Sequence, residues 1–178
     1  NFVNEKILKH QSLDIGDSTD VVNEINIIYR NRGLVLKNLN YRMTDKSLNN
    51  FFYLNLIKNI YPNAKVINCK RNVLSSIMSI LQNNLTDLAW AHDLNNIFKY
   101  FDNYFKCINK FKMDNPDYLY DLEFDLLVNN PKEESKKLMS YCELPWDKKC
   151  LEFYKRKDLI SKTASNIQIR EAIYKNSA

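Results

Sequence analysis

The segment around Arg71 combines residue types that could bind an anion. Arg71 directly follows a short apolar run, residues 64–69. A series of hydroxyl and amide side chains comes after it: Asn72, Ser75, Ser76 and Ser79. Residues three and four apart share one face of a helix, so these side chains would form a single stripe that reaches about 10–12 Å along the axis. This spacing suits a phosphate held between Arg71 and Ser79, and it equally suits a solvated polar face with an ordinary surface arginine.

The periodicity of the chain indicates the elements that position these residues. Residues 64–69 are predicted to be a buried strand of the parallel type, and Asn72 is predicted to cap a helix. In that helix Val73, Ile77, Ile80 and Leu81 are expected to face inward. Other elements are expected at 2–9 and 21–31 (helices), 41–46 (a short strand), 47–61 (a helix that Pro62 stops), 94–111 (the clearest helix), 117–122 (a strand) and 131–142 (a helix beginning with proline). Strands alternating with helices predict an α/β domain with a parallel sheet.

Composition sets the broad class. The chain has 178 residues, of which 45% are hydrophobic and 26% charged, as expected for a single globular domain. Two glycines and four prolines favour a helix-rich structure. The longest apolar runs are too short for a transmembrane helix, and the four cysteines lack zinc-site spacing, so we expect them to be reduced and buried. A net charge of +5 mildly favours an anionic partner.

A family resemblance gives the Arg71 segment a more specific meaning. Residues 61–79, YPNAKVINCKRNVLSSIMS, resemble the 3′-phosphate-binding segment of sulfotransferases that use 3′-phosphoadenosine 5′-phosphosulfate (PAPS). The lead-in is similar to that of bacterial and protein-tyrosine sulfotransferases. The resemblance implies that Arg71 and Ser79 hold the 3′-phosphate of the cofactor, while Lys70 points away without an assigned role. It also implies a P-loop-NTPase-like α/β fold, with a central parallel sheet flanked by helices.

Other segments resemble the same family in the same order. Residues 44–51, TDKSLNNF, resemble a motif whose lysine approaches the transferring sulfuryl group, which maps onto Lys46. Residues 122–131 match a YEDLV-type element, with Phe124 and Asp125 in place of tyrosine and glutamate.

Two C-terminal segments continue the resemblance. Residues 144–154, LPWDKKCLEFY, match a segment of the bacterial group. Residues 162–174, KTASNIQIREAIY, resemble a loop that closes over PAPS, without its usual proline. The resemblance implies further cofactor contacts from this loop: Ser165, Gln168 and Arg170.

Two expected parts of such a site are missing. The family's 5′-phosphosulfate loop should precede the first helix, but no segment matches it, so we expect a fragment truncated at its N-terminus. We also expect truncation at the C-terminus. The catalytic glutamate of relatives falls near Thr19. Asp17 and Asp20 flank that position and could substitute as the general base, or they could be ordinary loop and helix-cap acids. His10 and His92 are expected to be structural.

These observations favour an enzyme that transfers a sulfuryl group from PAPS to a hydroxyl acceptor without a metal. The acceptor could be a peptide tyrosine, a glycan or a small molecule. The alternative is an inactive, degenerate module that keeps the 3′-phosphate pocket. A nucleic-acid-binding domain is disfavoured, because the aromatic residues of 94–111 have core spacing. We expect a cytoplasmic, bacterial protein.

Overall fold

The computed structural model describes residues 20, 23–24, 27, 31, 42, 44–83, 85, 87–156 and 171–173. Contacts divide the chain into two units, 1–64 and 65–178. The expectation of a single domain stays a prediction.

The first unit contains a short 3-10 helix, η1 (Asn50–Tyr53), followed by helix α3 (Leu54–Ile60). The helix predicted over 47–61 is confirmed in part: residues 47–49 are not helical, and the α-helix covers only Leu54–Ile60. It ends before Pro62, as expected because a proline disfavours helical backbone at the preceding residue. The strand predicted at 41–46 is wrong, since Arg42 and residues 44–47 are irregular. Those residues are mostly polar. Among the described residues, the sheet consists of two strands that lie further along the chain.

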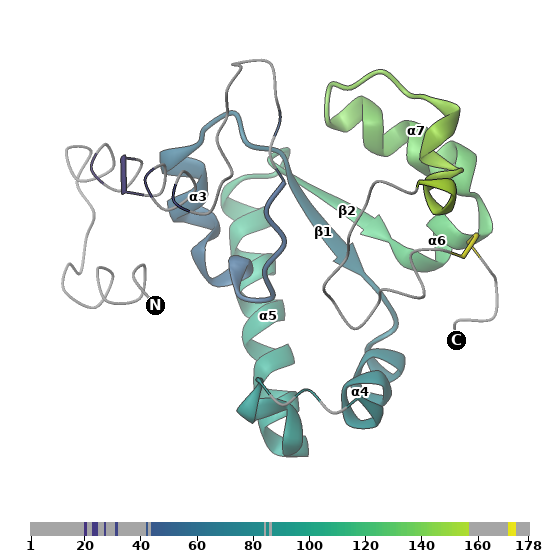
Figure 1. Ribbon diagram of the computed structural model, residues 1–178. Coiled ribbons are helices and arrows are strands. Elements are labelled where there is room, and N and C mark those ends of the chain that lie inside the picture. Colours follow the sequence, from purple (N-terminus) through teal and green to yellow (C-terminus); the bar gives the residue numbers. More distant parts are fainter. Residues whose placement is uncertain are drawn as a thin grey trace. The chain divides into compact units, whose positions relative to one another are not determined.

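The second unit is built on a strand–helix–strand crossover (Figure 1). Strand β1 (Val66–Lys70) leads into helix α4 (Val73–Gln82). A 3-10 helix, η2 (Ala89–His92), and the long helix α5 (Leu94–Asp114) then return the chain to strand β2 (Leu119–Glu123). The two strands pair in parallel, which confirms the α/β class expected from the sequence.

The chain continues beyond β2 as two short helices, α6 (Phe124–Asn129) and α7 (Pro131–Tyr141). Pro131 lies in the first turn of α7, where its missing N–H costs nothing, so the helix predicted at 131–142 is confirmed. Two 3-10 turns follow, η3 (Lys148–Cys150) and η4 (Phe153–Lys155).

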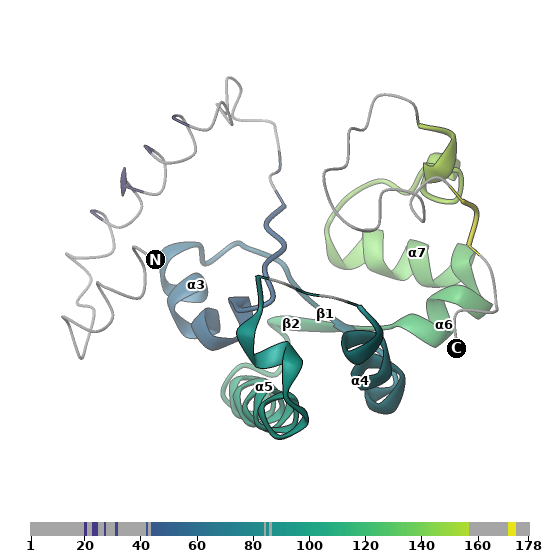
Figure 2. The same ribbon diagram turned by 60° about the horizontal axis from the view of Figure 1, so that its bottom comes forward.

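Different helices cover the two faces of the sheet (Figures 1 and 2). On one face, Asn68 and its register partner Asp121 receive hydrogen bonds from side chains of α5. On the other face, Tyr141 of α7 stacks on Tyr120, with ring centroids 5.0 Å apart. The Tyr141 hydroxyl lies 2.6 Å from the Tyr118 carbonyl and 3.1 Å from the Val66 carbonyl, so α7 is tied to both strand segments.

Burial differs from the sequence prediction at several apolar positions. In β1 only Asn68 is buried, whereas Ile67 is 38% exposed, because the described helices cover the two faces unequally. In α4 only Ile77 is buried, and Leu81, predicted to face inward, is 47% exposed. All four cysteines are free thiols, but only Cys142 is buried.

The predicted cap of α4 is confirmed. The Asn72 side chain accepts a hydrogen bond from the Ser75 backbone N–H at 3.0 Å. We expect Asn72→Ala to lower the free energy of unfolding by about 1 kcal/mol, because that N–H loses its partner. Asn72→Asp should retain most of the stability. Urea unfolding of both variants measures the change. If both substitutions lower the free energy of unfolding equally, the loss does not come from the side-chain acceptor of the cap.

Candidate functional site

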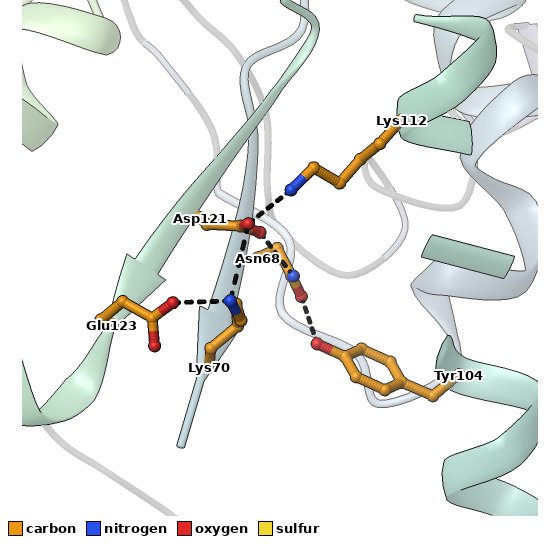
Figure 3. A network of polar contacts seen from close by, with 6 residues as sticks. All are labelled: Asn68, Lys70, Tyr104, Lys112, Asp121 and Glu123. Atoms are coloured by element: carbon orange, nitrogen blue, oxygen red, sulfur yellow. Dashed lines mark hydrogen bonds and ion pairs between the residues drawn. The ribbon is translucent and has the colours of Figure 1, made fainter. Parts of the chain in front are cut away.

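The carboxyl ends of β1 and β2 meet at one edge of the sheet. Their last residues, Lys70 and Glu123, are register partners, with the Lys70 ammonium 2.6 Å from a Glu123 carboxylate oxygen (Figure 3). This hydrogen bond raises the pKa of Lys70 above its ordinary value, although burial alone would lower it. Lys70, for which the sequence suggested no role, therefore holds the two strand ends together.

Arg71 and Phe124 are the first residues beyond these strand ends. Arg71 is exposed, and its guanidinium carbon lies 5.3 Å from the centroid of the Phe124 ring. A cation at this distance is attracted by the negative face of an aromatic ring. From the sequence, Phe124 was notable only because it replaces a tyrosine of the family element and so lacks its hydroxyl. Its partnership with Arg71 depends on strand pairing, which the local pattern does not reveal.

The hydroxyls of α4 do not all have the same role. Ser76 donates to the Asn72 carbonyl at 2.9 Å, within its own helix. Ser79 is partly exposed, and its hydroxyl accepts a 3.4 Å hydrogen bond from the Asn83 amide. Because Ser79 acts as the acceptor in that contact, its own proton can be donated to a second acceptor.

A polar network lies beneath the edge, on the face covered by α5 (Figure 3). Asn68 donates to Asp121 at 2.8 Å and accepts from the Tyr104 hydroxyl at 2.7 Å. Lys112 donates to the other Asp121 oxygen at 2.5 Å. Burial would raise the pKa of Asp121, but the hydrogen bonds from Lys112 and Asn68 and the nearby positive charges outweigh it and lower the pKa. The sequence feature that could have indicated this network is a polar residue in the middle of each apolar strand, Asn68 in β1 and Asp121 in β2.

The remaining candidate residues belong to other segments of the chain. Lys46 is exposed in the irregular stretch before η1, in the first unit. Asp20 is exposed and already helical, so it does not precede the helix as a cap would. His92 has a ring nitrogen 3.1 Å from the Leu85 carbonyl, consistent with its expected structural role. Five residues considered from the sequence fall outside the described residues: His10, Asp17, Ser165, Gln168 and Arg170.

The described part of the chain lacks two kinds of feature. It contains no cluster of three or more histidine, cysteine or acidic side chains that could hold a metal ion. None of its helices combines the length and apolar character needed to cross a membrane.

Comparison with known proteins supports the resemblance seen in the sequence. The sequence profile of the sulfotransferase family matches residues 24–148, well over half of the chain. An uncharacterized protein of Aquifex aeolicus (strain VF5) is 36% identical over 160 residues, which cover 84% of this chain. The matched region is 20% of that relative, so the chain spans about a fifth of its length. The helix-rich structure with its parallel strands agrees with the fold that the resemblance implied.

Proposed function

The chain belongs to the sulfotransferase family, and we propose that the protein transfers a sulfuryl group from PAPS to an acceptor hydroxyl, releasing 3′-phosphoadenosine 5′-phosphate (PAP). One observation carries the proposal: Arg71 lies directly beyond β1, at the edge where both parallel strands end. Ligands of α/β domains bind beyond the carboxyl ends of strands. An exposed guanidinium there, followed by a helix bearing a donor hydroxyl, suits a phosphate dianion.

The donor set fits a nucleotide phosphate chemically. A guanidinium offers paired N–H donors that match two phosphate oxygens, and it stays charged at any physiological pH. The family resemblance assigns the phosphate to Arg71, and the neighbouring Lys70 pairs with Glu123. In the proposal Arg71 and Ser79 bind the 3′-phosphate, and three further residues line the cofactor site: Ser165, Gln168 and Arg170.

The chemical roles rest on the resemblance. Lys46 stabilises the negative charge that builds on the phosphate oxygen as the S–O bond breaks, which is the usual role of a cation in such displacements. Asp17 or Asp20 accepts the proton of the acceptor hydroxyl while its oxygen bonds to sulfur. Charge and protons then balance: PAP leaves with the former bridging oxygen, and the carboxylate holds the proton.

A labelled-transfer experiment tests the proposed function. The full-length protein is incubated with PAPS carrying a ³⁵S-sulfuryl group and with a tyrosine peptide, a glycan or a small alcohol. We expect one acceptor class to become labelled, with equimolar release of PAP. Thr19 at the expected position of the catalytic glutamate favours a second candidate, a degenerate binding module. That candidate predicts PAP binding without labelling of any acceptor, and failure to bind PAP would contradict both.

Replacing Ser79 should have a moderate effect on the affinity for PAP. We expect Ser79→Ala to weaken PAP binding about fivefold, because one hydrogen bond to the phosphate is lost and water partly replaces it. Ser76→Ala is the matched control, since the Ser76 hydroxyl is already donated to the Asn72 carbonyl. Calorimetric titration of PAP measures both. Equal effects of the two substitutions would remove Ser79 from the site.

A further inference from the structure

We propose that Phe124 is a positioning residue, whose ring holds the Arg71 guanidinium in place for the 3′-phosphate. This inference rests on the proposed function. The inference gives a role to the face of the Phe124 ring. The family resemblance pointed only to a tyrosine hydroxyl at this position, and phenylalanine has no hydroxyl. The observation behind it is the 5.3 Å separation between the Arg71 guanidinium carbon and the Phe124 ring centroid.

Strand pairing explains why these two residues meet. The register places Lys70 opposite Glu123, so the next residue of each chain segment leaves the sheet at the same edge. The backbone pairing of the two strands fixes the spacing of these ends, and the Lys70–Glu123 ion pair spans them at 2.6 Å. Arg71 and Phe124 therefore start from backbone positions that are already held together, and their contact does not depend on a flexible loop.

A guanidinium that lies over an aromatic ring remains able to bind an anion. The ring attracts the face of the cation, whereas the N–H donors of the cation lie in its plane and point outward from its edge. Phosphate oxygens are bound by those edge donors. Covering one face of a guanidinium therefore does not by itself block its edge donors.

Contact with the ring also reduces the entropy cost of phosphate binding. A free arginine side chain samples many rotamers, and it loses that freedom when it grips a ligand. Phe124 is itself partly buried at the start of α6, directly after a paired strand, so it offers a fixed surface. A guanidinium that already rests on this surface loses less freedom when phosphate binds. The expected consequence is tighter PAP binding without any contact between Phe124 and the ligand.

Calorimetric titration of PAP into the full-length protein and its Phe124 variants tests the inference. We expect Phe124→Leu, which keeps an apolar side chain but removes the aromatic face, to weaken binding about three- to fivefold. Phe124→Tyr restores the face and should bind within about twofold of the starting protein. In an Arg71→Ala background, Phe124→Leu should have no further effect, because the ring acts only through Arg71.

Kinetics separates positioning from general loss of structure. Phe124→Leu should raise the KM for PAPS and leave kcat unchanged, while thermal unfolding reports any loss of stability separately. If Phe124→Leu binds PAP as tightly as the starting protein, or weakens binding equally with Arg71 absent, the inference is wrong and the proposed function stands. If the starting protein itself does not bind PAP, the proposed function fails and the inference falls with it.

Discussion

Arg71→Ala is expected to weaken PAP binding by roughly 1.5–3 kcal/mol, or about 10- to 150-fold. The reason is that a charge-assisted contact to a phosphate dianion is lost, and the solvated alanine site offers no replacement donor. Calorimetric titration of the full-length protein measures the effect. Arg71→Lys keeps the charge but lacks the paired donors of the guanidinium that lies over Phe124, so we expect an intermediate loss.

The adjacent cation provides the control for this experiment. Lys70 carries the same formal charge but is paired with Glu123 and lies near Asp121. Lys70→Gln should change PAP affinity by no more than about twofold, because a screened charge that makes no direct contact contributes little. If Lys70→Gln costs as much affinity as Arg71→Ala, the positive potential of the segment explains binding, and no specific contact by Arg71 is needed.

Asp121→Ala is expected to lower the free energy of unfolding by roughly 2–3 kcal/mol at neutral pH. The substitution removes the hydrogen-bond acceptor that Lys112 and Asn68 share on the face of the sheet covered by α5. It also removes the carboxylate that lies 3.7 Å from the Lys70 ammonium. The expected loss is less than for a fully buried pair, since the Asp121 side chain is 24% exposed and that of Lys112 is 39% exposed. Urea unfolding measures it.

A surface pair and the pH dependence make this prediction specific. Asp114 pairs with Lys110 in solvent, so Asp114→Ala should cost less than about 0.5 kcal/mol. The pKa of Asp121 is lowered in the folded state, so its stabilisation is fully present above its ordinary value of 3.8 and is lost as pH falls through the lower, folded-state pKa. The stability difference between the parent and Asp121→Ala should therefore narrow in acid. A difference that stays constant from pH 7 to about pH 2 would contradict the role of the carboxylate.

The sequence was sufficient for features that depend on neighbouring residues. Local patterns predicted that a strand ends near residue 70 and a helix follows, that Asn72 caps this helix, and that α7 begins with a proline. The structure confirms all three. The position of Arg71 beyond a parallel strand could be predicted for the same reason. The family resemblance added the 3′-phosphate as the ligand to be tested.

Features that depend on pairing across the chain could not be predicted. Lys70 and Glu123 are 53 residues apart, and only the strand register shows that they are opposite each other. The same register brings Arg71 to Phe124. Apolar periodicity likewise marked Leu81 as inward-facing, but its burial depends on what packs against α4, and it is 47% exposed. Asn68 and Asp121 were visible as polar residues in strands, yet their joint network requires α5.

The most direct test of the central claim compares two ligands and two proteins. PAP and adenosine 5′-monophosphate differ only in the 3′-phosphate, so the ratio of their affinities isolates that group. For the full-length protein we expect PAP to bind at least about fiftyfold more tightly, and for Arg71→Ala we expect this preference to fall to about fivefold, the share that the Ser79 hydroxyl supplies. A preference for PAP that survives intact in Arg71→Ala would show that the 3′-phosphate binds somewhere other than the edge of the sheet beside Arg71.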